Sequence, residues 1–234
     1  MNALLSALAS IGIFLVGMVA RFGLLLLVLA LLAGVFLAGL VVVRGVAWAR
    51  RRMLGLDRAN GIAWKRHGYY APGHTWVEVS GASTVRLGLD DLAQRVLGHV
   101  TGLSLASPGT ILAEGQAIGE VVCDDKHTSI PSPVAGKVIA INDAVTRDPS
   151  LLHRDPYRRG WLVGVEAANT AYTRLLYGEP ARDFLSREAQ RLTRFFEQEL
   201  QLHAADGGEF MAPGASFLDA QQWRKLVQSF LKAS

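Results

Sequence analysis

The apolar positions near the start of this chain form a continuous run instead of an alternating pattern. Residues 22–43 are 22 residues without a charge, rich in Leu, Val, Ala and Gly. A helix of about 20 apolar residues spans the hydrocarbon core of a bilayer, because every backbone group is then hydrogen-bonded inside the segment. An uncharged run of this length is unusual for the buried helix of a soluble protein. The pattern therefore predicts a transmembrane helix over residues 22–48.

Residues 1–21 are apolar as well, so the N-terminal stretch is longer than one span requires. One straight helix from residue 3 to residue 48 would be about 70 Å long, more than twice the thickness of the hydrocarbon core. Arg21 at the bilayer centre would cost about 2.5–3.5 kcal/mol on insertion scales. We expect a break near Gly17, Arg21 and Gly23, with residues 1–21 as an interfacial or membrane segment. A two-helix hairpin is the alternative, but no polar turn separates the two halves.

Basic residues follow the apolar run, at Arg44, Arg50, Arg51, Arg52, Arg58, Lys65 and Arg66. They stand where a cleaved signal peptide would need a small-residue cleavage site. The positive-inside rule places this flank, and with it the C-terminal domain, in the cytoplasm. The sequence thus predicts a single-pass membrane protein. The single cysteine, Cys123, cannot form an internal disulfide, which fits a reducing compartment.

Short strands separated by turn residues follow a basic, glycine-containing linker at residues 49–73, and they predict a β domain over residues 74–168. Asp90 and Asp91 open a short helix that ends near Leu97. A further helical turn is expected over Pro149–Asp155. The expected strands are Thr75–Val79, Thr84–Leu89, Val100–Leu105, Gln116–Cys123, Ser129–Pro133, Gly136–Asn142 and Trp161–Glu166.

Residues 169–234 show helical spacing and predict a C-terminal helical extension. Glu179-Pro180 is typical of a helix start, and the run from Ser216 to Asp219 resembles a capping box before a last helix. We expect the apolar helix faces to pack on the β domain, with a docking surface for a partner as the alternative. These faces carry Leu185, Ala189, Leu192, Phe196, Leu200, Trp223, Leu226, Val227, Phe230 and Leu231.

Charge is distributed unevenly along the chain. Residues 1–52 hold five Arg and no Asp or Glu, whereas the remaining 182 residues hold 19 Lys and Arg against 20 Asp and Glu. The formal net charge of +4 therefore comes from the apolar segment, and it gives no support to a nucleic-acid partner.

Motifs for metal binding or catalysis are not found in the sequence. The six histidines lack metal-ligand spacing, and no nucleophile elbow, phosphate loop or dinucleotide fingerprint occurs. His127 lies near Cys123 and Asp125 in sequence, which suggests a metal or nucleophilic site, but exposed turn residues explain the combination more simply. We expect no catalytic residue and no metal ligand.

The most specific signal is a series of motifs between Tyr70 and Ala168. They resemble the glycine cleavage H protein, and the hairpin among them also resembles lipoyl domains of 2-oxoacid dehydrogenases. The resemblance implies a mainly β fold, a barrel-sandwich hybrid like that of lipoyl domains, here with an N-terminal transmembrane helix and C-terminal α-helices. The motifs are His74-Thr75-Trp76-Val77, Leu87-Gly88-Leu89-Asp90-Asp91-Leu92-Ala93-Gln94, Ser132-Pro133-Val134-Ala135-Gly136, Asp155-Pro156-Tyr157 and Gly160-Trp161-Leu162.

The resemblance also implies a carrier that has no catalytic activity of its own. In the family, a lipoyl group on one lysine at a hairpin tip carries an aminomethyl group and electrons between partner enzymes. That lysine stands seven residues before the serine of Ser-Pro. Seven residues before Ser132 is Asp125, whereas Lys126 is six residues before it. A shift of one residue turns a strand side chain to the other face, and a carboxylate cannot form the lipoyl amide.

Three functions are compatible with this pattern. The favoured one is a non-catalytic adaptor or accessory subunit of a membrane complex, without lipoate, whose partners are the membrane and other membrane-complex subunits. The second is a membrane-tethered lipoyl carrier that is modified at Lys126 and serves glycine-cleavage-type enzymes. The third is a membrane-fusion-type efflux component, which normally has long coiled-coil hairpins that this sequence lacks. None of the three requires a nucleic acid.

Overall fold

The computed structural model describes residues 2–53, 55–200 and 218–232, and the chain divides into two compact units at residue 53. The first unit is a single helix, α1 (Asn2–Met53). It runs uninterrupted through Gly17, Arg21 and Gly23, so the expected break in the backbone is wrong. Glycine costs a helix only about 1 kcal/mol relative to alanine, and no proline precedes Pro72 to interrupt it.

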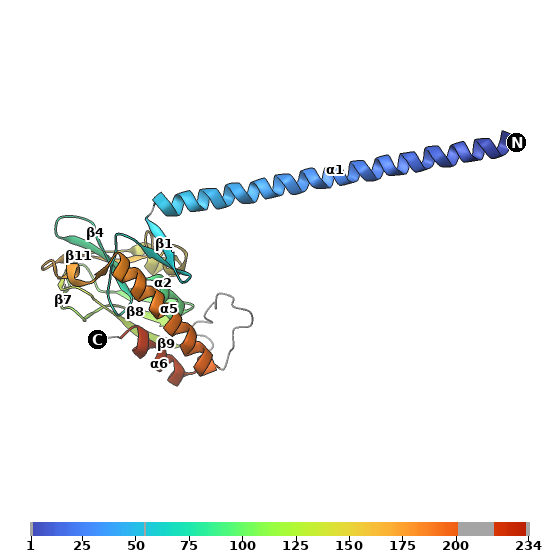
Figure 1. Cartoon of the computed structure of the whole chain (residues 1–234). Coiled ribbons are helices and arrows are strands. Elements are labelled where there is room, and N and C mark those ends of the chain that lie inside the picture. Colours follow the sequence, from blue (N-terminus) through green and yellow to red (C-terminus); the bar gives the residue numbers. More distant parts are fainter. Residues whose placement is uncertain (1, 54, 201–217, 233–234) are drawn as a thin grey trace. The chain divides into compact units, whose positions relative to one another are not determined.

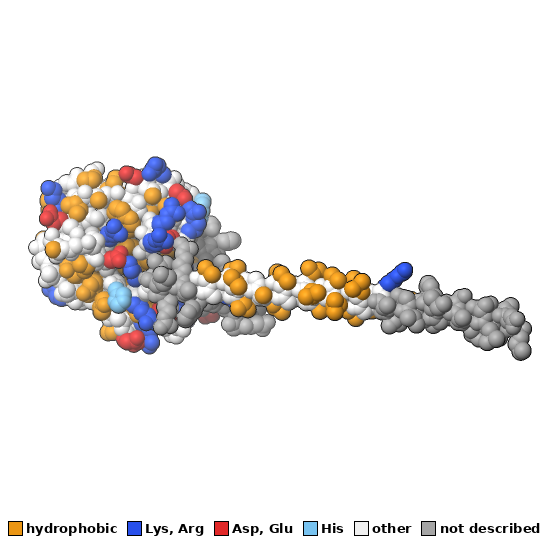
Figure 2. Space-filling view, turned by 90° about the horizontal axis from the view of Figure 1, so that it is seen from above, with side chains coloured by type: hydrophobic (Ala, Val, Ile, Leu, Met, Phe, Trp, Pro, Cys, Tyr) orange, Lys and Arg blue, Asp and Glu red, His pale blue; other side chains and the backbone are white. Residues whose placement is uncertain are grey.

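Within α1, the stretch Arg21–Val46 is long and apolar enough to cross a membrane, and none of it is buried against other residues. Consecutive residues from Leu24 to Val28 are all apolar and exposed, and five consecutive residues of a helix point to all of its sides. Figure 2 shows exposed apolar side chains along the face in view. A surface helix of a soluble protein would instead carry one apolar stripe and one polar face. Length and composition therefore agree with the predicted span.

The second unit is a β domain with helices packed on it (Figure 1). A seven-stranded antiparallel sheet has the order β12-β3-β4-β5-β11-β10-β7, and a three-stranded sheet has the order β6-β8-β9. The strands are β1 Leu56–Ala59, β2 Ile62–Lys65, β3 Tyr69–Tyr70, β4 Thr75–Val79, β5 Thr84–Leu89, β6 Gly102–Leu105, β7 Ile111–Leu112, β8 Ala117–Cys123, β9 Lys126–Pro131, β10 Gly136–Ile141, β11 Trp161–Ala167 and β12 Leu176–Tyr177. The helices are α2 Asp91–Leu97, α3 Asp143–Arg147, α4 Leu151–Arg154, the 3-10 helix η1 Ala171–Arg174, α5 Glu179–Leu200 and α6 Ala220–Phe230.

The core of the second unit is formed largely by residues of the short strands that the sequence pattern predicted. β4 and β5 have the expected bounds, and their residues Val77, Val85 and Leu87 are almost fully buried. The main shift is in β9, which begins at Lys126 instead of Ser129. The turn before it contains only two residues, so pairing with β8 continues to the end of the hairpin.

The expected linker at residues 49–73 is wrong. α1 extends to Met53, and β1 and β2 form an antiparallel hairpin. Ile62 and Trp64 are buried, and the backbone N–H of Ala63 donates to the Asp91 carboxylate at 2.9 Å. Each strand has only four residues, and basic side chains and glycines surround them. That composition concealed the alternation in the sequence.

The C-terminal helices pack against the β domain, as expected from their apolar faces. Phe196 of α5 and Phe230 of α6 are buried in the same apolar cluster as Val77 and Leu92. The capping box of α6 begins at Asp219, whose side chain accepts from the N–H of Gln222 while the Gln222 side chain accepts from the N–H of Asp219. The predicted starting residue, Ser216, lies outside the described residues.

Candidate functional site

The hairpin between β8 and β9 ends in the tightest connection that antiparallel strands allow. Cys123 faces Lys126 across the hairpin, so that Asp124 and Asp125 alone form the turn. Asp124 has a φ of 55°, a conformation that aspartate adopts more readily than most residues. The side chain of Asp125 is 85% exposed. Asp125 thus occupies the tip, where the family resemblance requires the acceptor lysine.

Lys126 lies below the tip, on the inward side of β9. Thr128 and Ile130 share this side of the strand and are buried, whereas His127 and Ser129 face outward. The Lys126 side chain is only 13% exposed, and its Nζ lies 3.3 Å from Oδ1 of Asp125. This hydrogen bond lowers the pKa of Asp125. The one-residue shift therefore separates an exposed carboxylate from a largely covered lysine.

Cys123 and His127 do not form a joint site. Cys123 is buried, and its burial, assisted by the charge of Asp124, raises the pKa of the thiol to about 12. A thiol protonated at neutral pH is a poor nucleophile. His127 points to the other face, where its Nδ1 lies 3.7 Å from Glu120. Among the residues that the structure describes, no three His, Cys, Asp or Glu side chains are placed to share a metal ion.

A second polar cluster is buried beneath the C-terminal helices. His74 is fully buried, and its Nδ1 lies 2.9 Å from Oδ2 of Asp90, the N-cap residue of α2. On the other side, His74 Nε2 lies 3.6 Å from the Glu188 carboxylate of α5, which is too far for a normal hydrogen bond, so this contact is Coulombic. Phe184 stacks on the imidazole ring with centroids 5.3 Å apart. The cluster joins the β domain to α5.

Charge governs the protonation of His74. Burial alone would lower its pKa, but the adjacent Asp90 carboxylate and the more distant Glu188 carboxylate raise the pKa of His74 to about 9. The imidazolium in turn helps to lower the pKa of Glu188, against the effect of its own burial. Arg191 pairs with Glu188 at 2.8 Å and lies over the Phe230 ring of α6. The result is a row of alternating charges from α2 to the C-terminal helices.

The sequence indicated parts of this cluster but not their assembly. His74 was recognised only as the first residue of a family motif, and Asp90 only as a helix start. Glu188 was not identified, because it comes from a helix about 100 residues further along the chain. No sequence pattern predicts the φ of 59° at His74, nor the contacts of its ring with Phe184 and Glu188 of α5. By contrast, the sequence alone points to Asp125, because it stands seven residues before Ser132.

Comparisons with known proteins match the β domain. The family model described as "Glycine cleavage H-protein" matches residues 68–188, which include the β8–β9 hairpin. The glycine cleavage system H protein of Mycobacteroides abscessus is 41% identical over 103 residues, which cover 44% of this chain and 79% of that protein. Its counterpart in Mycobacterium avium is 37% identical over 123 residues, covering 50% of this chain and 93% of that protein.

Among solved structures, the crystal structure of a glycine cleavage system H protein from Mycobacterium marinum matches with a TM-score of 0.42 and 26% identity, covering 45% of this chain and 87% of that one. The expected fold class, mainly β and lipoyl-domain-like with an N-terminal apolar helix and C-terminal helices, is confirmed. α1 and α6 lie outside the matched residues. The chain belongs to the glycine cleavage H-protein family.

Proposed function

We propose that this chain is a membrane-anchored H-protein-like adaptor that carries no lipoate and catalyses no reaction. The observation that carries the proposal is the hairpin tip, where an exposed carboxylate stands in place of an acceptor lysine. An acceptor must be exposed for a modifying enzyme to reach it and for the arm to move. Asp125 is exposed but cannot form an amide, whereas Lys126 has an amine but is 13% exposed.

The anchoring part of the proposal is supported by α1. Its apolar stretch Arg21–Val46 is long enough for one span. The basic residues that follow favour a cytoplasmic β domain. A carrier that diffuses between enzymes gains nothing from such an anchor, whereas a subunit held within a membrane complex does. The partners we propose are therefore other subunits at the membrane, with no nucleic acid involved.

A lipoyl carrier modified at Lys126 is the second candidate. It is favoured by family membership and by the position of Lys126, which directly follows the two-residue turn. This candidate requires the Lys126 amine to leave Asp125 and emerge from the inward side of β9. Partners in that case would be glycine-cleavage-type enzymes. A membrane-fusion-type efflux component is a weaker candidate, because neither α5 nor α6 forms a long helical hairpin inserted in the β domain.

Replacement of an H protein in the glycine cleavage reaction separates the two leading candidates. The full chain, purified in mild detergent after co-expression with an active lipoylation system, should not restore glycine oxidation to the other three enzymes of the system. A lipoylated H protein from the same cells serves as the positive control. Restoration of the reaction above the level without added protein would contradict the adaptor assignment and support the carrier.

Topology is tested independently of lipoylation. A reporter fused after Ser234 should be active only if the reporter requires the cytoplasm, because the basic flank of α1 holds the C-terminal domain inside the cell. A matched reporter that works only outside the cytoplasm should be silent at the same position. Activity of the external reporter, or cleavage of the β domain by protease added to intact cells, would refute this orientation.

A further inference from the structure

The β domain contains a polar cavity that the hairpin and its chemistry do not use. It has a volume of about 190 Å³ and is lined by Leu56, Lys65, Glu78, Arg86, Tyr157 and Arg158. These residues come from β1, β2, β4 and β5 and from the segment before β11. Five separate stretches of chain therefore converge on one small concave site, and none of its lining residues belongs to the β8–β9 hairpin.

The charges around this cavity are unbalanced. Lys65 and Glu78 form an ion pair in its wall, and both side chains are less than one-third exposed. Arg86 is the direct cross-strand neighbour of Glu78, yet the carboxylate is engaged by Lys65. The Arg86 guanidinium instead lies over the Trp161 ring, 5.5 Å from its centroid. Among the described residues, neither Arg86 nor Arg158 has a carboxylate within ion-pair distance.

We propose that this cavity binds a phosphate group through Arg86 and Arg158. Lys65, Arg86 and Arg158 against Glu78 leave two positive charges, which match a phosphate dianion. Guanidinium groups present paired N–H donors that fit the oxygens of phosphate. The cavity is large enough for one phosphate group with a few waters. Stacking on Trp161 restricts the motion of Arg86, so less entropy is lost on binding.

The phosphate has two chemically equivalent sources, a phosphomonoester lipid headgroup and a phosphate-bearing solute. In the sequence, Leu56 of the cavity wall follows Met53, the last residue of α1, by three residues. Only the lipid source rests on the proposed membrane anchor; binding of free phosphate does not.

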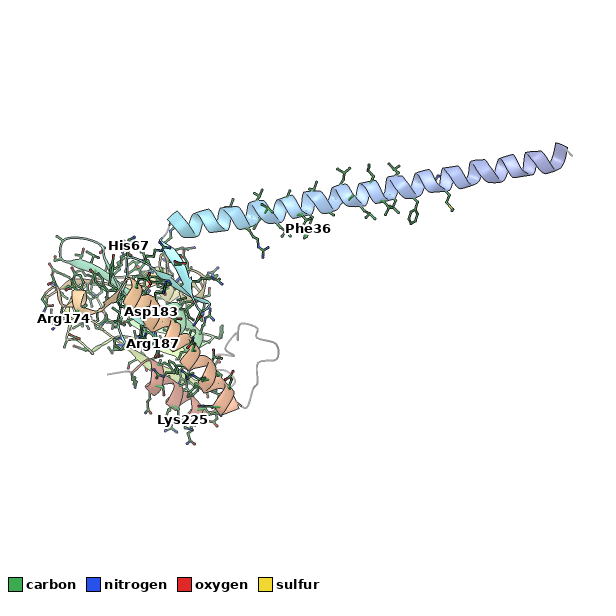
Figure 3. All side chains as sticks on the ribbon, in the orientation of Figure 1. Phe36, His67, Arg174, Asp183, Arg187 and Lys225 are labelled. Atoms are coloured by element: carbon green, nitrogen blue, oxygen red, sulfur yellow. The ribbon has the colours of Figure 1, made fainter. Side chains whose placement is uncertain are left out.

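The test uses the full chain in a neutral detergent, titrated calorimetrically with inorganic phosphate at constant ionic strength. Saturable binding to one site is expected. Arg86→Gln and Arg158→Gln should each weaken binding about tenfold or more, because each removes a charge-assisted hydrogen bond. Arg86→Lys should restore part of the affinity. The control variants Arg174→Gln and Arg187→Gln remove exposed arginines on η1 and α5, shown in Figure 3, and should bind like the wild type.

A second measurement identifies the source of the phosphate. The chain is placed in nanodiscs that contain phosphatidic acid or, at matched net charge, phosphatidylserine, and bound lipid is read by native mass spectrometry. Phosphatidic acid adducts that depend on Arg86 and Arg158 support a lipid ligand, whereas saturable inorganic phosphate binding without such adducts supports a soluble one. Absence of saturable phosphate binding, or equal weakening in the two control variants, would overturn the site. Because the titration needs no membrane, its result is independent of the proposed anchor.

Discussion

Replacing Asp125 by lysine should give a protein in which most molecules carry a lipoyl group, whereas we propose that the wild-type chain carries none. The substitution places an amine at the exposed second position of the two-residue turn, where the family has its acceptor. The side chain there is 85% exposed, so a lysine fits without repacking. Co-expression with an active lipoylation system, followed by intact mass measurement, reads the result directly.

Matched variants make this experiment specific for position. Asp125→Asn removes the same charge without adding an amine and should stay unmodified. Asp125→Lys combined with Lys126→Arg should still be lipoylated, because the acceptor is the tip residue. If neither tip-lysine variant gains a lipoyl group, lysine position is not what prevents modification.

The second large expected effect is that the folded protein loses stability as the pH rises, because His74 loses its proton. Its pKa in the folded protein is about 9, above the ordinary value of 6.5 in the unfolded chain. The imidazolium therefore contributes stability that is fully present below about pH 6.5 and is lost as the pH rises through about 9. The linked loss is on the order of 3 kcal/mol. Urea unfolding of the β domain, followed by Trp fluorescence across this window, measures it.

His74→Asn should flatten this pH dependence and lower the stability at pH 6, because Asp90 and Glu188 lose the cation between them. Asparagine tolerates the positive φ of this position, so the substitution adds little backbone strain to the measured change in stability. The raised pKa of Cys123 affects unfolding only above about pH 9, and the lowered pKa of Glu188 acts in the acid range. The control His99→Asn changes an exposed histidine. A pH profile unchanged by His74→Asn would contradict this role.

Local sequence signals predicted much of the β domain, for reasons visible in particular elements. β4 and β5 have the expected bounds because each is a short run of strand-forming residues between clear turn residues. α5 was recognised from Glu179-Pro180 and the spacing of Leu185, Ala189 and Leu192, which the structure buries. The spacing of apolar residues and the turn or cap residues at the ends of an element are local properties, so one sequence is enough to show them.

Features that depend on distant contacts were not predictable in this way. β1 and β2 have four residues each, and their burial depends on contacts of Ala63 with Asp91 and Tyr157. The His74 cluster needs Glu188, which only the docking of α5 brings near. The expected break in α1 rests on the thickness of the bilayer, which does not limit the length of a helix. A helix can extend beyond the bilayer, and the glycines near Arg21 do not suffice to end it.

The β8–β9 hairpin has one feature that the local sequence predicts and one that depends on tertiary packing. Residue counting from Ser132 predicted that Asp125 holds the acceptor position, and the register of β8 and β9 places it at the tip. The covered position of Lys126 required the structure, because it depends on which face of β9 packs inward. A slip of one residue therefore changes both the chemistry at the tip and the accessibility of the nearby amine.

The intact mass of the wild-type chain tests the central claim most directly. The protein is purified from cells that have an active lipoylation system and that also express a normal H protein, whose mass shows that the system works. We expect the wild-type chain to have the mass of the unmodified sequence. A mass increase of one lipoyl group, located on Lys126 by peptide mapping, would contradict the adaptor account and establish a lipoyl carrier.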